Sequence, residues 1–451
     1  MKLLVRSLSK TTMLNRFLFT RIDNSALVVF RVFFGLLIAL EAFGSIATGW
    51  IKRTLIEPQE TFNFIGFEFL QPLPGNGMLY YYGVMGLFGL LVMVGYKYRF
   101  SIFCYTIMWA SVYLMQKSSY NNHYYLLMLL CGIMFFLPAH KNASIDAWRN
   151  ASLREISMPR WVWLFIVFQM WIVYTYASVA KLYPDWFNGE FPRILMKSKA
   201  DYWLVGDLLQ QGWAHMSISW FGFLFDLLII PLLLYRKTRV PVFIAAIFFH
   251  LFNSFIFHIG IFPYLSLAFT LFFFPSEKIN KWFLRGKKKY YDEKKIILPK
   301  YRNAFLAVIS IWFIFQLGLP LRHWFYEDDV LWTEEGHRLS WRMMLRSKSG
   351  RSAFRVVDKD TKKVEYIDKA KFLSNKQLGA ISSKPDMIWQ FSQRLKREYA
   401  KKGQDVQIFV DSKVSVNGRP YQQFIDPKVD LANEKWHHFK HHDWILPSKL
   451  D

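Results

Sequence analysis

The chain has 451 residues, of which 53% are hydrophobic and 19% are aromatic. Several apolar runs are long enough to cross a bilayer, so the composition indicates a polytopic membrane protein and not a soluble one. The formal net charge is +24, but the basic residues lie mainly between the apolar runs, which favours a topogenic role over nucleic-acid binding. Cys104 and Cys131 are the only cysteines and lie in apolar runs, which excludes a disulfide framework.

The first 25 residues are basic and have no small-residue cleavage site, so we expect a retained cytosolic leader over residues 1–25. A membrane helix bundle of about nine transmembrane helices is expected over residues 26–320. Apolar runs predict its spans at Ala26–Thr48, Met78–Gly95, Phe100–Met115, Tyr124–Leu137, Trp161–Ala180, Ile218–Leu234, Val240–Phe257, Ile261–Phe274 and Ala304–Leu319.

The loops between these spans predict the orientation. Those that follow the second, fourth, sixth and eighth spans, together with the N-terminus, carry roughly three times as many lysines and arginines as the others. Because basic loops remain on the cytosolic side, the N-terminus is expected in the cytosol. Nine crossings then place the C-terminal part on the exported side.

Residues 321–451 are more polar and are expected to form a small exported α+β domain. Strand-like runs occur at Ala353–Asp358, Val364–Asp368 and Val406–Val410, and a helical pattern covers Asp386–Lys402. Asn417-Gly418, between Val414–Val416 and Tyr421–Ile425, predicts a hairpin with a two-residue turn.

Two polar motifs lie at the mouths of neighbouring spans. Asn122 and His123 begin the fourth span and Lys181 follows the fifth, so under the predicted topology they share the exported face. Tyr174, Ser178 and Lys181 are at helical spacing and form a polar stripe on the fifth span. Partial burial would lower the pKa of Lys181 and make it a base. The alternative is an interfacial lysine that reaches the headgroups.

The seventh span carries His250 and Asn253 on one helical face, within a phenylalanine-rich run. Polar groups beside an aromatic cavity suit an apolar ring that bears oxygens, such as a quinol. The alternative for His250 is a hydrogen-bonded packing group.

Three further charged residues, Arg31, Glu41 and Asp226, fall inside predicted spans, where each needs a partner. We interpret them as polar contacts that stabilise the bundle, and Asp226 could also orient a catalytic group. The histidine-rich run 436–442 would space two pairs of histidines as helical metal ligands, but no acidic or cysteine partner is apparent in the sequence, so no metal site is predicted.

Together these motifs resemble the vitamin K-dependent gamma-carboxylase family, whose membrane part is called the HTTM domain. The resemblance runs through most of the chain and is carried by motifs in the same order. They are Phe30-Arg31, Asn121-Asn122-His123, Lys181-Leu182 with Asp185-Trp186, His250 with Asn253-Ser254, Ser340-Trp341-Arg342-Met343-Met344, Val414-Ser415-Val416-Asn417, Gln422-Gln423 and Phe424-Ile425-Asp426-Pro427. The shorter length resembles that of the bacterial members.

The resemblance implies an enzyme that converts reduced vitamin K (the hydroquinone) and O2 to the epoxide, and uses the strong base so generated to carboxylate a protein glutamate with CO2. It implies that Lys181 deprotonates the hydroquinone and that His123 serves carbanion formation and carboxylation. By the same analogy, Asn122, His250, Asn253 and Tyr174 contact the quinone. Arg31, Asp185, Trp186 and Asp226 support the site.

The implied partners are the lipid bilayer, an isoprenoid quinol and an exported protein or peptide that contains glutamate; no nucleic acid is expected. The resemblance favours a bacterial inner membrane, and an endoplasmic reticulum membrane fits the same physics. Two alternatives stay open: a quinol epoxidase that does not carboxylate protein, and a transporter or scaffold without enzymatic activity.

Overall fold

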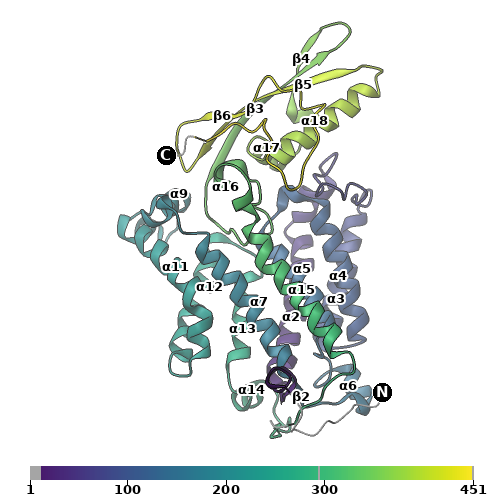
Figure 1. The fold of residues 1–451 in the computed structure, drawn as a ribbon, viewed down its shortest axis with the longest axis vertical. Helices are drawn as coiled ribbons and strands as arrows, with labels where there is room; N and C mark the ends of the chain where they lie inside the picture. Colours follow the sequence, from purple (N-terminus) through teal and green to yellow (C-terminus); the bar gives the residue numbers. More distant parts are fainter. Residues whose placement is uncertain (1–11, 293–294, 449–451) are drawn as a thin grey trace.

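The structure is a computed structural model that describes residues 12–292 and 295–448. A bundle of long helices forms most of the molecule, and a small domain with a β-sheet lies beyond one end of it (Figure 1). We call this end of the bundle the domain end and the opposite end, near β2 and α14, the far end. The predicted fold class, a mainly helical membrane bundle followed by a small α+β domain, is confirmed.

Six helices are long and apolar enough to cross a membrane within the described residues. They are α2 (Ser25–Ala47), α3 (Gly77–Val94), α7 (Arg160–Val179), α11 (Gly212–Leu234), α12 (Arg239–Phe257) and α15 (Arg302–Leu321). The other predicted spans coincide with α4 (Tyr98–Met115), α5 (Asn122–Phe136) and α13 (Phe262–Phe269), which continues as the 3-10 helix η5 (Thr270–Phe273). The number of nine crossings stays a prediction, because α5 and α13–η5 are shorter than the six.

Short elements close the far end of the bundle. They are α1 (Met13–Phe19), β1 (Arg21–Asp23) paired with β2 (Ser157–Pro159), α6 (Ile145–Arg149), η4 (Ala151–Leu153) and α14 (Ser276–Phe283). The later part of the predicted leader is therefore packed against the bundle, whereas its lysines and arginine at positions 2, 6 and 10 lie outside the described residues. Lys287, from the basic loop after α14, pairs with Asp23 at 3.0 Å.

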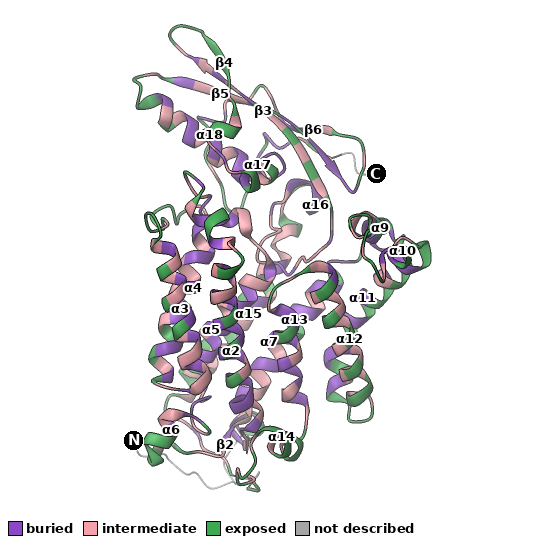
Figure 2. Ribbon diagram, turned by 180° about the vertical axis from the view of Figure 1, so that it is seen from behind, coloured by how far each residue is buried: buried purple, intermediate pink, exposed green. Residues whose placement is uncertain are grey.

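Further short helices line the domain end. They are η2 (Lys52–Ile56), η3 (Lys117–Ser119), α8 (Pro184–Phe187), α9 (Glu190–Lys197), α10 (Gly206–Leu209), η6 (Arg322–Phe325) and α16 (Val330–Thr333). Figure 2 shows buried residues inside the bundle and many exposed ones on the outer faces of α11 and α12. Large apolar side chains on those faces are expected of helices that contact lipid.

The C-terminal domain is an antiparallel sheet of strand order β4-β3-β5-β6, packed against α17 (Asn375–Ile381) and α18 (Pro385–Ala400). Its strands are β3 (Lys348–Asp358), β4 (Val364–Tyr366), β5 (Val406–Val416) and β6 (Gln422–Ile425), and a short 3-10 helix, η7 (Lys369–Lys371), follows β4. Buried residues alternate along the first half of β5, as expected of a strand with one face on a core. The predicted strands and helix are confirmed, although β3 and β5 are longer than expected.

Two local predictions differ from the structure. The turn at Asn417 and Gly418 forms, with Arg419 N donating to Val416 O at 3.1 Å, but pairing with β6 begins only at Val414 opposite Gln422. A hairpin with only two connecting residues is therefore wrong, because Asn417 is held by Ser347 instead. The histidine run 436–442 is not helical, so helical pairing of its histidines is also wrong.

Candidate functional site

A cavity of about 360 Å³ lies among α7, α11 and α12 near the domain end, beneath α9. Most of its wall is aromatic or aliphatic, and Met343 and Met344 of the C-terminal part contribute to it. Seven of the residues predicted from sequence line this one cavity: His123, Tyr174, Lys181, Trp186, Asp226, His250 and Asn253. The fold thus gathers side chains from four helices and two short segments around a single apolar space.

Lys181 is held just beyond the end of α7 and is 6% exposed. Its Nζ donates to Ala177 O at 3.0 Å and forms an ion pair with the Asp226 carboxylate of α11. The indole ring of Trp186 lies 5.3 Å from the same nitrogen. An ammonium has three N–H donors, so two are used by the protein and the third remains for the cavity that Lys181 lines. The alternative of a lysine that reaches the headgroups does not fit this geometry.

His250 and Tyr174 form a second polar pair in the wall of the cavity. The Tyr174 hydroxyl lies 3.2 Å from His250 Nε2, and both side chains are buried. The other ring nitrogen of His250, Nδ1, is buried and has no hydrogen-bond partner among the described residues. A buried ring nitrogen without a partner is rare in proteins, and His250 is one of the residues that line the cavity.

His123 enters the cavity from the first turn of α5. Asn121 caps this helix, accepting a hydrogen bond from Tyr124 N at 2.7 Å, so the cap fixes the start of α5 and with it the position of His123. The imidazole ring stacks on Phe262 of α13 with centroids 4.1 Å apart. His123 therefore presents a ring held by packing.

Three predicted site residues lie outside the cavity wall. Asn122 donates to Arg342 O at 3.0 Å and accepts from the Tyr120 hydroxyl at 2.8 Å. Asp185 binds Arg419 at 2.6 and 2.9 Å. Both residues thus connect the bundle to the C-terminal part. Arg31 lies near the far end, where its guanidinium donates to the carbonyl oxygens of Ala139, Asn142 and Ala143, and it supports the bundle there.

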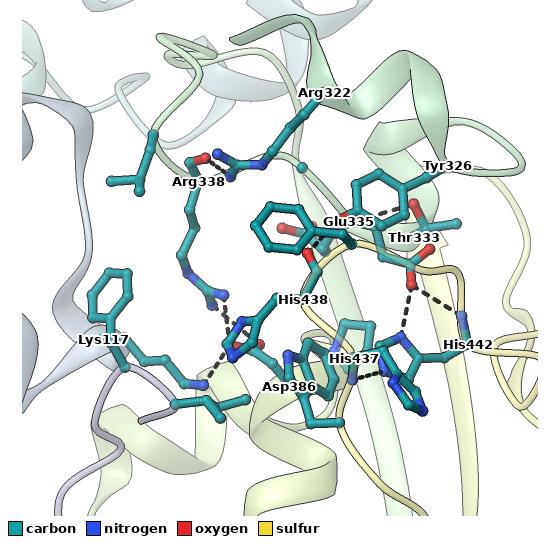
Figure 3. Close-up of a pocket in the computed structure, with 18 of the residues that line it drawn as sticks. Lys117, Arg322, Tyr326, Thr333, Glu335, Arg338, Asp386, His437, His438 and His442 are labelled. Atoms are coloured by element: carbon teal, nitrogen blue, oxygen red, sulfur yellow. Dashed lines mark hydrogen bonds and ion pairs between the residues drawn. The ribbon is translucent and has the colours of Figure 1, made fainter. Parts of the chain in front are cut away.

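A second buried charge cluster joins the two parts of the chain. Asp386 of α18 accepts from Lys117 of η3 at 2.5 Å and from Arg338 at 2.5 and 3.2 Å. Figure 3 shows these side chains converging on one wall of a cavity of about 330 Å³. No sequence pattern indicated this cluster, because Lys117 follows an apolar helix as an ordinary loop residue would.

The surroundings of this cluster set its protonation. Burial would raise the pKa of Asp386, but Arg338 and Lys117 outweigh burial and lower it well below its usual range. Burial lowers the pKa of Lys117 to about 8, although Asp386 partly opposes this shift. At neutral pH the cluster thus holds one carboxylate between two cations.

Part of the histidine run, His437, His438 and His442, lines the same cavity. His441 Nδ1 and His442 Nδ1 lie 2.6 and 2.9 Å from the Glu335 carboxylate, and Figure 3 shows His442 beside it. The acidic partner that the sequence did not reveal is thus Glu335, about a hundred residues away. Its contacts fix the last part of the chain against the segment after α16.

Comparison with known protein families matches two descriptions to the chain. Residues 19–278 match the HTTM domain, and residues 301–451 match the lumenal domain of vitamin K-dependent gamma-carboxylase. The first match alone covers more than half of the chain and contains every residue named above that lines the 360 Å³ cavity, except Met343 and Met344. The chain belongs to the vitamin K-dependent gamma-carboxylase family. No solved structure matches it.

Family membership agrees with the sequence resemblance and implies the use of reduced vitamin K, O2 and CO2. The cavity fits the ring of such a quinol, because its wall is mainly aromatic and the His250 Nδ1 atom lacks a protein partner. Among the described residues, no group of three or more histidine, cysteine or acidic side chains is arranged to hold a metal ion. The lumenal description of the second domain indicates that the C-terminal part is exported.

Proposed function

We propose that the protein is a membrane enzyme that couples oxygenation of reduced vitamin K to carboxylation of glutamate in an exported protein. The observation that carries this proposal is the Lys181–Asp226 pair, which is buried and lines an apolar cavity at the domain end. An ionisable pair in such a place is costly unless it has a function. When bound, the reduced quinol reacts with O2 and supplies the strong base that removes the γ-proton of glutamate.

Lys181 is the residue placed to accept the first proton. Asp226 receives one N–H of its ammonium, so the proton of that hydrogen bond can reside on either partner. When the carboxylate takes it, the amine keeps a lone pair, which can then accept a proton from a hydroxyl in the cavity. Asp226 thereby acts both as the orienting group and as a reservoir for the lysine proton.

In this proposal His250 and Tyr174 orient the ring. Their mutual hydrogen bond fixes the imidazole, leaving Nδ1 to bind a ring oxygen. Asn253 lines the same wall one helical turn further along α12 and can bind the same oxygen. Two polar contacts from α12 together with Lys181 would hold an apolar ring that bears oxygens.

His123 is assigned to the glutamate. It lines the cavity from α5, and its neighbour Asn122 binds the backbone of Arg342 beside Met343. A glutamate that arrives past the C-terminal part would meet His123 at this boundary. The aromatic wall limits water, which would otherwise quench a strong base before carbon dioxide reacts.

The proposal includes the orientation and division of the chain: a cytosolic leader (1–25), a bundle (26–320) and an exported domain (321–451). A lipid-soluble quinol then reaches the cavity through the bilayer, and the protein substrate reaches it from the exported side. The two substrates would then meet at the domain end, where the reaction takes place. The bacterial inner membrane remains the proposed location.

The test uses purified protein with vitamin K hydroquinone, O2, labelled CO2 and a glutamate peptide. Wild-type protein is expected to form epoxide and to fix label, and His123→Ala is expected to keep epoxide formation while losing fixed label. Epoxide without fixed label from the wild type would select the epoxidase alternative for these substrates. Neither product from folded wild-type protein would favour a transporter or scaffold.

A further inference from the structure

Two of the short helices between α7 and α11, α9 and α10, form a separate feature, which we call the α9–α10 segment (residues 190–209). Met196 and Leu209 on one side are buried against Ile256 of α12. On the other side Trp203 is 92% exposed and Leu204 is also exposed. A short segment that exposes a tryptophan and a leucine beside membrane helices needs an apolar surrounding.

The cavity opens beside this segment. Phe221 of α11 and Phe248 of α12 line the cavity, and both also lie on the outer surface, Phe248 with 71% of its area exposed. Figure 2 shows α11 and α12 as neighbours on one flank of the bundle. The cavity therefore extends to the face that lipid covers, between these two helices.

The lengths of the two helices place the segment at one membrane surface. Helices α11 and α12 have 23 and 19 residues, and are about 35 and 28 Å long at about 1.5 Å per residue. The hydrocarbon core is about 30 Å thick. Because α11 begins and α12 ends beside the α9–α10 segment, Trp203 lies at the level of the interface, where tryptophan is enriched in membrane proteins.

We propose that the α9–α10 segment lies in the outer leaflet and holds open a lateral portal between Phe221 and Phe248. The portal takes the prenyl tail of the ligand whose ring occupies the cavity. The cavity volume of about 360 Å³ is near the lower end of the range for pockets that bind drug-sized ligands. The ring of the ligand is therefore expected to fill the cavity, and a long tail has to extend outside it. The tail then lies among lipid chains. The role of the portal rests on the proposed function, but the membrane position of the segment does not.

The membrane position is tested with Leu204→Cys in a Cys104→Ser/Cys131→Ser background, labelled with an environment-sensitive dye in phosphatidylcholine nanodiscs. Quenching by lipid-borne nitroxides is expected to exceed quenching by aqueous iodide. The matched control is Tyr366→Cys on β4, which is similarly exposed and should show the reverse. Quenching of position 204 by iodide, as at position 366, would overturn the membrane position.

The portal is tested by blocking it after folding. Phe248→Cys is modified with a bulky maleimide, and KM for epoxide formation is measured with a long-tailed quinol and with a tail-less one. The ratio of the two KM values is expected to rise about tenfold, because a few methylene groups lose their apolar contacts. Ile244→Cys, exposed one turn away on α12 and outside the cavity, should keep its ratio after modification.

An unchanged ratio at position 248 would overturn the portal even if the segment lies in lipid. Failure of the proposed function is recognised separately. In that case no epoxide forms from either quinol, and the quenching of the label at position 204 is unaffected.

Discussion

Two buried lysine–aspartate pairs lie at the domain end of this molecule, and their surroundings differ. Lys181 and Asp226 form a pair of one cation and one anion that borders an apolar cavity. Lys117 is bound to Asp386 together with Arg338, so that carboxylate is held from two sides. The first pair keeps one donor position for a ligand, whereas the second connects η3, α18 and the segment after α16.

The comparison shows that burial of a lysine does not by itself identify a catalytic base. Both lysines are more than nine-tenths buried, and both have an aspartate partner. Both lysines border a cavity, but the cavity beside Lys181 has a mainly apolar wall that also includes His123, His250 and Asn253, and only Lys117 shares its carboxylate with an arginine. We therefore expect substitutions at the first pair to affect turnover and those at the second to affect stability.

Among substitutions of the partners of these two lysines, the largest effect is expected for Asp226→Asn. The amide keeps the shape and a hydrogen bond but cannot take a proton from Lys181, so the rate of epoxide formation should fall by about 10²–10⁴-fold. The measurement is epoxide formed per folded molecule, with the thermal unfolding temperature as the check on folding. A rate within a few fold of wild type would show that Asp226 only positions the lysine.

Asp386→Asn should produce the opposite profile. It leaves Lys117 and Arg338 buried without their shared carboxylate, which costs about 3–5 kcal/mol. The thermal unfolding temperature should fall clearly, whereas the rate per folded molecule should remain close to wild type. A large loss of rate without loss of stability would contradict the assignment of Asp386 to stability and not to turnover.

The free energy of unfolding is also expected to depend on pH through the buried Lys117. Because the pKa of Lys117 is about 8 in the folded protein and about 10.4 in an unfolded chain, unfolding takes up a proton between these values. The free energy of unfolding of wild type should therefore rise relative to Lys117→Met as pH increases from about 8 to 10, by at most about 1.4 kcal/mol per pH unit. Unfolding curves at several pH values measure it, and a constant difference would contradict the shift.

The smallest effect is expected for Arg419→Met. Its ion pair with Asp185 joins the hairpin turn after β5 to α8, but both side chains are partly exposed. Such pairs contribute about 1 kcal/mol or less. The loss of stability should be measurable as a small decrease in the unfolding temperature. Arg419→Met should cause no further decrease in a protein that already carries Asp185→Asn.

Much of the bundle could be predicted from sequence because each span is a continuous apolar run, and the ends of α2 and α7 were placed within one residue. The alternation along β5 likewise predicted its sheet. The Lys181–Asp226 pair could not be predicted, since its members are 45 residues apart and only packing of α7 against α11 brings them together. The sequence therefore indicated Asp226 as a possible orienting or supporting residue, but not that it pairs with Lys181.

Other features had no local signal at all. Met343 and Met344 belong to a motif of the C-terminal part, and only the fold shows that they close the cavity. Glu335 is separated from His441 by more than a hundred residues, so the histidine run looked unpartnered. Residues that join distant segments depend on tertiary packing, which neither hydropathy nor spacing reports.

In the proposed reaction the base is Lys181, and not Lys117, the other buried lysine that pairs with an aspartate at the domain end. The most direct measurement compares Lys181→Ala with Lys117→Ala for epoxide formed and labelled CO2 fixed, each per folded molecule. We expect Lys181→Ala to abolish both products, whereas Lys117→Ala should lose stability but keep both. Products from folded Lys181→Ala at a rate near that of wild type would contradict it.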